Sequence, residues 1–117
     1  MHMPAAVEKE RVRAVKTIQG VVAKHFYIPL ERMLSKQRPA HVVWPRQIAM
    51  SIAYELSHLS TTQIAPLFNC KDHGTILHAC SRVATEERST NKAATSVRAD
   101  ILLCRALSKS ALHKANL

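Results

Sequence analysis

Residues 72–75, Asp-His-Gly-Thr, stand where a helix is expected to begin, and the side chains of Asp72, His73 and Thr75 can hydrogen-bond to the edges of DNA bases. Thr75 offers a hydroxyl and a methyl group, and the methyl group suits the methyl of thymine. Asp72 can accept from a cytosine amino group, or it can cap the helix by accepting its first free backbone N–H groups. Both roles of Asp72 stay open. Periodicity alone puts His73 on the apolar side of the helix, as a partly buried histidine.

A basic stretch upstream has the composition of a surface that binds phosphates. No Asp or Glu occurs between Glu31 and Glu55, whereas four basic residues do. These are Arg32, Lys36, Arg38 and Arg46. A basic loop taken at random is most often simply solvated, but the local lack of carboxylates favours a phosphate-facing role. We therefore predict a basic, DNA-facing loop over residues 35–44.

Helices are predicted to hold both groups in place, because apolar side chains recur every three or four positions along most of the chain. The expected helices are 8–26, 29–36, 45–58, a short one that opens at Ser60, 72–87 and 90–113. Pro45 suits the first turn of the third helix. Ser60 and Gln63 form a capping box, and Pro66 should shorten or distort the helix that they open.

The order of these elements is that of a helix-turn-helix: a helix, a short capped helix, a turn at residues 69–71 and a longer amphipathic helix. The predicted apolar face of that last helix holds Ile76, Leu77, Cys80 and Val83. Its other face holds Thr75, His78 and Arg82. In this motif the last helix lies in the major groove with its first residues at the base edges. The predicted class is an all-α domain of five to six helices.

Length and charge indicate the kind of partner. The 117 residues carry 17 Lys and Arg against 8 Asp and Glu, a formal net charge of +9, which suits one domain with a polyanionic partner. The aromatic residues are scattered, so the stacking platforms of single-strand binders are disfavoured and duplex DNA is the better candidate. A membrane surface stays possible on charge alone.

Composition also excludes several function classes. Two glycines cannot build a Gly-rich phosphate loop, so we expect no nucleotide binding and no ATPase in this chain. Three cysteines and no stretch of signal-peptide or membrane-spanning length indicate a cytoplasmic protein with reduced thiols. His73 and His78 stand about 140° apart on a helix and cannot converge on one metal ion. No catalytic arrangement is recognisable, so neither an enzyme nor a cofactor is expected.

Three segments resemble a known family. They are MLSKQR at residues 33–38, PRQ at 45–47 and, most specific of the three, KDHGTILHAC at 71–80. All three resemble the C-terminal DNA-binding domain, domain IV, of the bacterial replication initiator DnaA. The resemblance covers about residues 18–83 well and the last helix only loosely.

This resemblance implies binding to DnaA boxes, which are short asymmetric duplex sites in replication origins and some promoters. It implies that Arg38 enters the minor groove, whose negative potential attracts a slender cation. Arg46 and Gln47, expected at a helix N-terminus, are implied to contact DNA there. The implied contacts at the start of the recognition helix are Asp72, His73, Gly74 and Thr75. Lys36, Lys71 and His78 match positions near the phosphates.

Five positions depart from the family's pattern. Gly74 stands where threonine is typical, so one base contact is expected to be lost. Asn69 and Cys70 replace a Gly-Gly turn, and Asn tolerates a left-handed backbone better than Cys does. Trp44 and Ser81 stand where the family often has basic residues. DNA binding is expected to persist, while the recognised bases and the strength of preference stay open.

We expect one domain over residues 1–117, with an N-terminal helix extension (1–17), a DnaA-like helix-turn-helix core (18–88) and a basic C-terminal helix (89–117). The predicted function is sequence-selective binding of duplex DNA, in the nucleoid, by an excised domain or a stand-alone relative of the initiator without its ATPase module. A stand-alone relative could regulate transcription or compete for DnaA boxes. The alternative is a non-specific DNA-binding or protein-interaction module whose helix-turn-helix has drifted.

Overall fold

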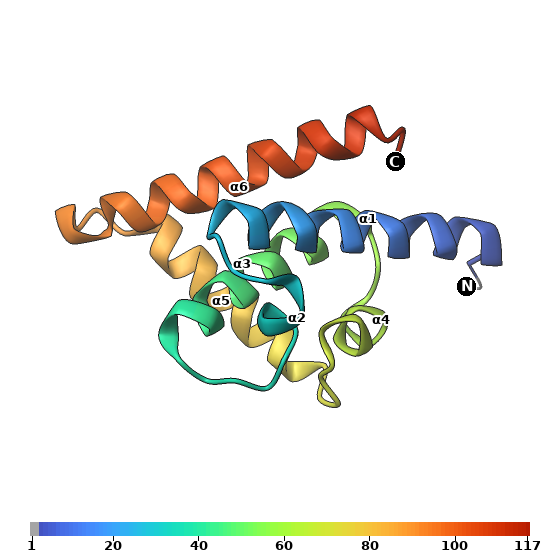
Figure 1. Ribbon diagram of the computed structural model, residues 1–117, viewed down its shortest axis with the longest axis horizontal. Coiled ribbons are helices and arrows are strands. Elements are labelled where there is room, and N and C mark those ends of the chain that lie inside the picture. Colours follow the sequence, from blue (N-terminus) through green and yellow to red (C-terminus); the bar gives the residue numbers. More distant parts are fainter. Residues whose placement is uncertain (1–2) are drawn as a thin grey trace.

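The computed structural model describes residues 3–117, which form helices joined by short connections (Figure 1). The helices are α1 (Ala5–His25), α2 (Leu30–Met33), α3 (Ala40–Ser57), α4 (Thr61–Ile64), η1 (Ala65–Phe68), α5 (Gly74–Arg88), η2 (Lys92–Ala94) and α6 (Thr95–Lys114), where η denotes a 3-10 helix. No strand occurs within residues 3–117. The predicted all-α class and the order of a helix-turn-helix are confirmed.

One hydrophobic core joins the four long helices. Its fully buried members include Val15, Ile18 and Val22 of α1, Ile48 and Ile52 of α3, Ile76 of α5, and Ile101 and Cys104 of α6. α1 and α6 lie side by side and run in opposite directions along one side of the molecule, while α2 to α5 occupy the other side (Figure 1). The helix-turn-helix is therefore backed by a layer of two long helices.

The first two helices differ in length from the prediction. α1 begins three residues early, because Pro4 at its N-cap has a φ of −57°, which already suits a helix. It ends before Tyr27, whose positive φ of 54° breaks the helical path. α2 is a single turn, and its buried residue is Met33. Leu30, the first residue of this helix, is 39% exposed.

The start of α3 corrects the prediction that Pro45 begins the third helix. The helix begins at Ala40, because Pro39 takes the N-cap and its carbonyl accepts from the backbone N–H groups of Val42 and Val43, both at 2.9 Å. Pro45 lies buried in the second turn, where its missing N–H removes one helical hydrogen bond. The basic loop is therefore shorter than predicted, and Arg46 and Gln47 do not lie at a helix N-terminus.

The capping box at Ser60 is confirmed. Ser60 Oγ accepts from the backbone N–H of Gln63 at 3.1 Å, and Gln63 Oε1 accepts from the backbone N–H of Ser60 at 2.9 Å. Pro66 falls in η1, so the helix tightens there as predicted. In α5 the buried residues are Ile76, Ala79 and Val83. Leu77, expected on the apolar face, is 50% exposed, because the stripe that faces α3 passes through Ala79 instead.

Polar contacts hold α6 against the rest of the fold. Arg105 donates two hydrogen bonds to Glu87 of α5, at 2.7 and 2.8 Å, and one to Glu55 of α3 at 3.1 Å. Asp100 lies 2.9 Å from His25 at the end of α1. Arg98 donates to the carbonyl of Ser89, just beyond the end of α5. Within residues 3–117, no helix is both long and apolar enough to cross a membrane.

Candidate nucleic-acid interface

An open groove of about 530 Å³ lies between the loop after α2, the middle of α3, the turn before α5 and the first turn of α5. Six of the ten predicted site residues line it: Lys36, Arg38, Arg46, Lys71, Asp72 and Thr75. Four of these are cations and one is a carboxylate, so the charge of the groove favours an anionic ligand. The fold thus brings the basic loop and the start of α5 together.

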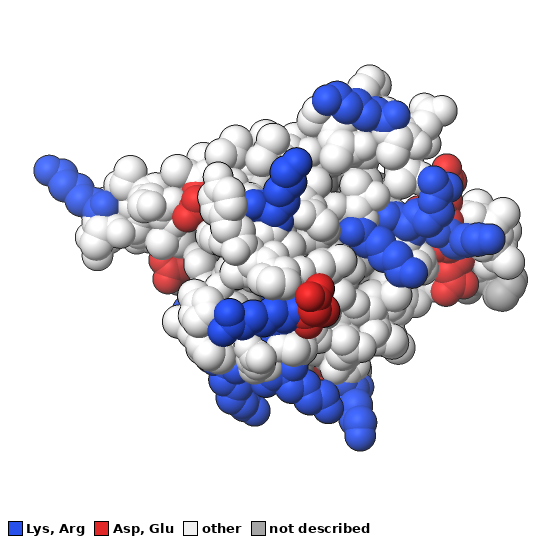
Figure 2. All heavy atoms as spheres, viewed as in Figure 1, with Lys and Arg blue, Asp and Glu red and all other residues white. Residues whose placement is uncertain are grey.

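Three of these cations are available to a ligand. Lys36, Arg38 and Lys71 are exposed, and none of the hydrogen bonds or ion pairs within residues 3–117 engages their side chains. Arg32, by contrast, donates from Nε to Gln37 Oε1 at 2.8 Å and so braces the loop. In Figure 2, Lys and Arg side chains project along the lower edge, where Figure 1 has this loop and the turn before α5. α6 lies along the opposite edge of the molecule, away from this loop and turn.

Arg46 connects the groove to the fold. Its Nε donates to the carbonyl of Met33 at 2.6 Å, which ties the end of α2 to α3. Its Nη2 is buried and has no partner among the described residues. Burial lowers the pKa of this guanidinium, and the nearby thiol of Cys70 opposes that shift. Arg46 therefore acts first as an anchor for the basic loop, with only part of its guanidinium left to a ligand.

Asp72 precedes the start of α5 and bonds to its first residue. Its Oδ1 accepts from the backbone N–H of Gly74 at 2.8 Å, so the carboxylate satisfies one free N–H group as expected. Asp72 is not the N-cap that was predicted, because α5 begins at Gly74 and its N-cap is His73, which makes no side-chain capping bond. A Cβ on Gly74 would lie 3.1 Å from the same oxygen. His73 is exposed, contrary to the helical wheel, because it precedes the first turn of α5. Thr75 and His78 are exposed farther along the helix.

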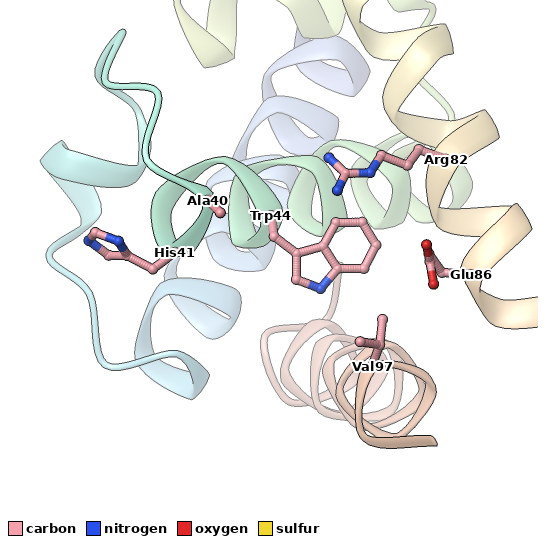
Figure 3. A pocket seen from close by; sticks show the side chains of 6 residues that line it. All are labelled: Ala40, His41, Trp44, Arg82, Glu86 and Val97. Atoms are coloured by element: carbon pink, nitrogen blue, oxygen red, sulfur yellow. The ribbon is translucent and has the colours of Figure 1, made fainter. Parts of the chain in front are cut away.

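Gln47 lies outside the groove and is held by Arg82. Arg82 Nη1 donates to Gln47 Oε1 at 2.5 Å, and the guanidinium carbon lies 4.9 Å from the centre of the Trp44 ring. Figure 3 shows this guanidinium against the indole, beside a pocket that Glu86 and Val97 also line. This contact could not be predicted from the sequence, because Arg82 and Gln47 are 35 positions apart and share no motif.

The turn between η1 and α5 is tied to the basic loop by Asn69. Asn69 has a φ of 58°, as expected for the turn residue that best tolerates a left-handed backbone. Its Nδ2 donates to the carbonyl of Leu34 at 2.8 Å, directly before the loop. Cys70, which follows, is not among the residues of positive φ, and burial raises the pKa of its thiol. One amide side chain thus shapes the turn and positions the loop beside it.

Metal-ligating side chains are not clustered beside the groove or elsewhere among the described residues. Within residues 3–117, no three His, Cys, Asp or Glu side chains lie close enough together to hold a metal ion. Of the ten predicted residues, Gln47, His73, Gly74 and His78 do not line the groove. The residues that sequence reasoning missed are those that support the site, Asn69 and Arg82, whose partners are distant along the chain.

Comparison with known proteins gives one consistent family. Residues 15–83 match the model described as the bacterial dnaA protein helix-turn-helix. The chain is 43% identical over 77 residues to the chromosomal replication initiator protein DnaA of Psychromonas ingrahamii, with 66% of this chain and 17% of that protein covered. It is 44% identical over 78 residues to DnaA of Herminiimonas arsenicoxydans, with 67% and 17% covered.

DnaA of Burkholderia cenocepacia is likewise 44% identical over 78 residues, with 67% of this chain and 15% of that protein covered. The matched region therefore corresponds to a small part of these relatives. It spans the end of α1 through most of α5, which includes the groove, the turn and the start of α5. The chain belongs to the bacterial DnaA helix-turn-helix family, and its domain is a DnaA domain IV, a DNA-binding domain.

Proposed function

We propose that this domain binds duplex DNA sequence-selectively at DnaA-box-like sites. The observation that carries the proposal is the groove in which two loop cations, Lys36 and Arg38, lie beside Lys71, Asp72 and Thr75 of the helix-turn-helix. A helix-turn-helix reads bases with the start of its last helix, while cations around it hold the phosphates. The start of α5 and the exposed cations have the arrangement that this division of roles requires.

The loop and the turn supply the first set of proposed contacts. Arg38 enters the minor groove, because it is exposed, unpaired within residues 3–117 and permanently charged. Lys36 and Lys71 bind phosphates on either side of it. Arg46 adds the free part of its guanidinium, although its main bond is to the carbonyl of Met33.

The helices supply the second set. Asp72, His73, Gly74 and Thr75 face the base edges in the major groove, with Asp72 restrained by its bond to the N–H of Gly74. Gln47 and His78 contact the DNA backbone at the side of the groove. We further propose that residues 18–88 form the DNA-binding core, with residues 1–17 and 89–117 as its supporting extensions.

The test is the binding of fluorescent duplexes, one with a DnaA box and one with the same base pairs scrambled, over a range of salt concentrations. Wild-type protein should prefer the box. Arg38→Ala should reduce the preference for the box by about 1–3 kcal/mol, and Lys71→Ala should weaken binding to both duplexes equally. Lys109→Ala removes an exposed cation from α6, on the other side of the molecule, and is the matched control that should change neither affinity. Equal affinity of the wild-type protein for the two duplexes would contradict the proposal.

Gly74 favours a second candidate, a non-specific DNA-binding module. A glycine at the first position of the recognition helix offers no side chain to a base. A module of this kind binds both duplexes with equal affinity, and its affinity falls steeply with salt, because phosphate contacts dominate. The same titrations separate the two candidates.

A further inference from the structure

The side chain of Arg82 contacts two neighbouring side chains of the protein. Its guanidinium stacks on Trp44 at 4.9 Å, and its Nη1 donates to Gln47 Oε1 at 2.5 Å (Figure 3 shows the stack). Arg82 belongs to α5, whereas Trp44 and Gln47 belong to α3. The contacts therefore join the side of the recognition helix to the helix in front of it.

The hydrogen bond decides how the amide of Gln47 is oriented. A glutamine amide has one oxygen that accepts and one nitrogen that donates two hydrogen bonds. Arg82 occupies the oxygen, and a guanidinium can only donate, so the amide cannot flip without losing this bond. The NH₂ group of Gln47 makes no hydrogen bond within residues 3–117, and it can serve only a ligand that accepts.

We propose that Arg82 is a positioning residue for DNA recognition: it holds Gln47 so that the Gln47 NH₂ group donates to an acceptor on the duplex, a phosphate oxygen. This inference rests on the proposed function, in which Gln47 contacts the DNA backbone. Trp44 provides the flat surface that orients the guanidinium, because cations bind to the face of an indole. Arg82 thus acts on the DNA through Gln47.

The competing role for Arg82 is a phosphate contact of its own. A direct phosphate contact by a cation is independent of Gln47, whereas a positioning role disappears once Gln47 is removed. The two roles are therefore separated by a double-mutant cycle, which measures the interaction between two side chains. They also differ in salt dependence, because a lost cation–phosphate contact reduces the salt slope of binding by about one.

The experiment measures box affinity for the wild-type protein, Arg82→Ala, Gln47→Ala and the double variant. We expect Arg82→Ala to weaken binding by about three- to tenfold, the range for one lost hydrogen bond. In the Gln47→Ala background the same change should have almost no effect. Arg88→Ala removes one charge from an exposed position on the same helix and is the matched control. The salt slope of Arg82→Ala should stay close to that of the wild-type protein, because a positioning role loses no cation–phosphate contact.

Trp44 gives a second readout, because it is the one tryptophan in the chain. Its fluorescence should change in Arg82→Ala, which loses the stack, and stay unchanged in Gln47→Ala, with melting temperatures confirming that all variants fold. Equal losses for Arg82→Ala in both backgrounds overturn the positioning role and assign Arg82 a contact of its own. If the wild-type protein does not prefer the box duplex over the scrambled one, the proposed function is wrong, and the positioning role of Arg82, which depends on it, is wrong as well.

Discussion

Gly74 is the residue at which the recognition helix has the most room for change. It begins α5, its φ is not positive, and so its backbone accepts any ordinary side chain. A Cβ there would lie 3.1 Å from Asp72 Oδ1, closer than usual, but that oxygen is at the end of a side chain that can rotate. A substitution therefore asks for a small shift of Asp72, with no change in the path of the main chain.

We predict that Gly74→Thr binds a DnaA-box duplex more tightly than the wild-type protein. The new hydroxyl and methyl groups would stand beside those of Thr75 at the base edges, and a good base contact is worth about 1–3 kcal/mol. Fluorescence anisotropy with box and scrambled duplexes measures the gain. Gly74→Ala is the control, since it adds the Cβ and the helix propensity without the hydroxyl. Equal affinities for the Thr and Ala variants would show that no base contact was gained.

Asn69 is the residue on which the turn depends. We predict that Asn69→Ala lowers the free energy of unfolding by about 2 kcal/mol, because alanine at a φ of 58° is strained and the bond to the Leu34 carbonyl is lost. Asn69→Gly keeps the backbone free of strain and loses only the bond, so it should cost about half as much. Urea titrations compare the two. Equal losses would mean that backbone strain contributes nothing at this position.

At the scale of single residues, the sequence predicted which residues matter better than it predicted their hydrogen-bond partners. Asp72 was expected either to cap α5 or to read a base, and its carboxylate does accept from the Gly74 N–H, but the N-cap of α5 is His73. His73 was placed on the apolar side by a periodicity that does not apply before the helix begins. The bonds of Arg46 to Met33 and of Arg82 to Gln47 could not be predicted, because they depend on how three separate helices pack.

Among the elements, α3, α5 and α6 meet at one arginine. Arg105 of α6 bonds to Glu87 of α5 and Glu55 of α3, and its own side chain is only 18% exposed. The hydrogen bonds from Arg105, opposed by partial burial, lower the pKa of the Glu87 carboxyl. The bonds from Glu87 raise the pKa of Arg105, so the guanidinium stays charged at any pH at which the protein is folded. This pair joins the recognition helix to the helix behind it.

The Glu87 carboxyl gives a pH dependence whose sign follows from its lowered pKa. The stabilisation is complete above the pKa of about 4.3 that Glu has in the unfolded chain, and it is lost as pH falls through the lower pKa of the folded state. We predict that Glu87→Gln destabilises the domain near neutral pH by roughly 1 kcal/mol and that this difference shrinks in acid. Denaturant titrations from pH 7 to about pH 3 measure it.

Glu10→Gln is the control for that series, because Glu10 is exposed on α1 and engaged in none of the ion pairs within the described chain. It should leave the pH dependence unchanged. A Glu87→Gln variant whose stability falls with acid as steeply as that of the wild-type protein would exclude Glu87 as the source.

The identity of the elements was predictable, and their ends were less so. Apolar periodicity and the Ser60 capping box are local signals, and they gave the long helices and the helix-turn-helix order. The start predicted from Pro45 was wrong because proline is common in the first turn of a helix, whereas Pro45 lies in the second turn of a helix whose N-cap is Pro39. The prediction that Leu77 lies on the apolar face was wrong, because the buried residues of α5 are those that face α3.

As a whole, the molecule separates its proposed DNA-binding side from its supporting side. The basic loop and the start of α5 lie at one edge, and α6 lies along the opposite edge, packed on α1 (Figure 1). The net charge of +9 is therefore divided between a groove that suits DNA and a back layer that does not face it. Because one core runs through both sides, we expect the docking of α6 and the shape of the groove to depend on each other.

Cys104 tests this coupling, because it lies in the core at 0% exposure, on the face of α6 turned toward the other helices. Burial, with a smaller contribution from Asp100, raises the pKa of its thiol to about 12, so the reactive thiolate is suppressed at neutral pH.

In a variant with Cys70→Ser and Cys80→Ser, we predict that a thiol reagent labels Cys104 only when the whole domain unfolds. The labelling rate, measured against urea, should rise with the same dependence as global unfolding. The single variant Cys104→Ser is the control, since its half-buried thiols should react in native buffer. Rapid labelling of Cys104 without urea would mean that α6 detaches on its own, and the docking of α6 and the shape of the groove would then be independent of each other.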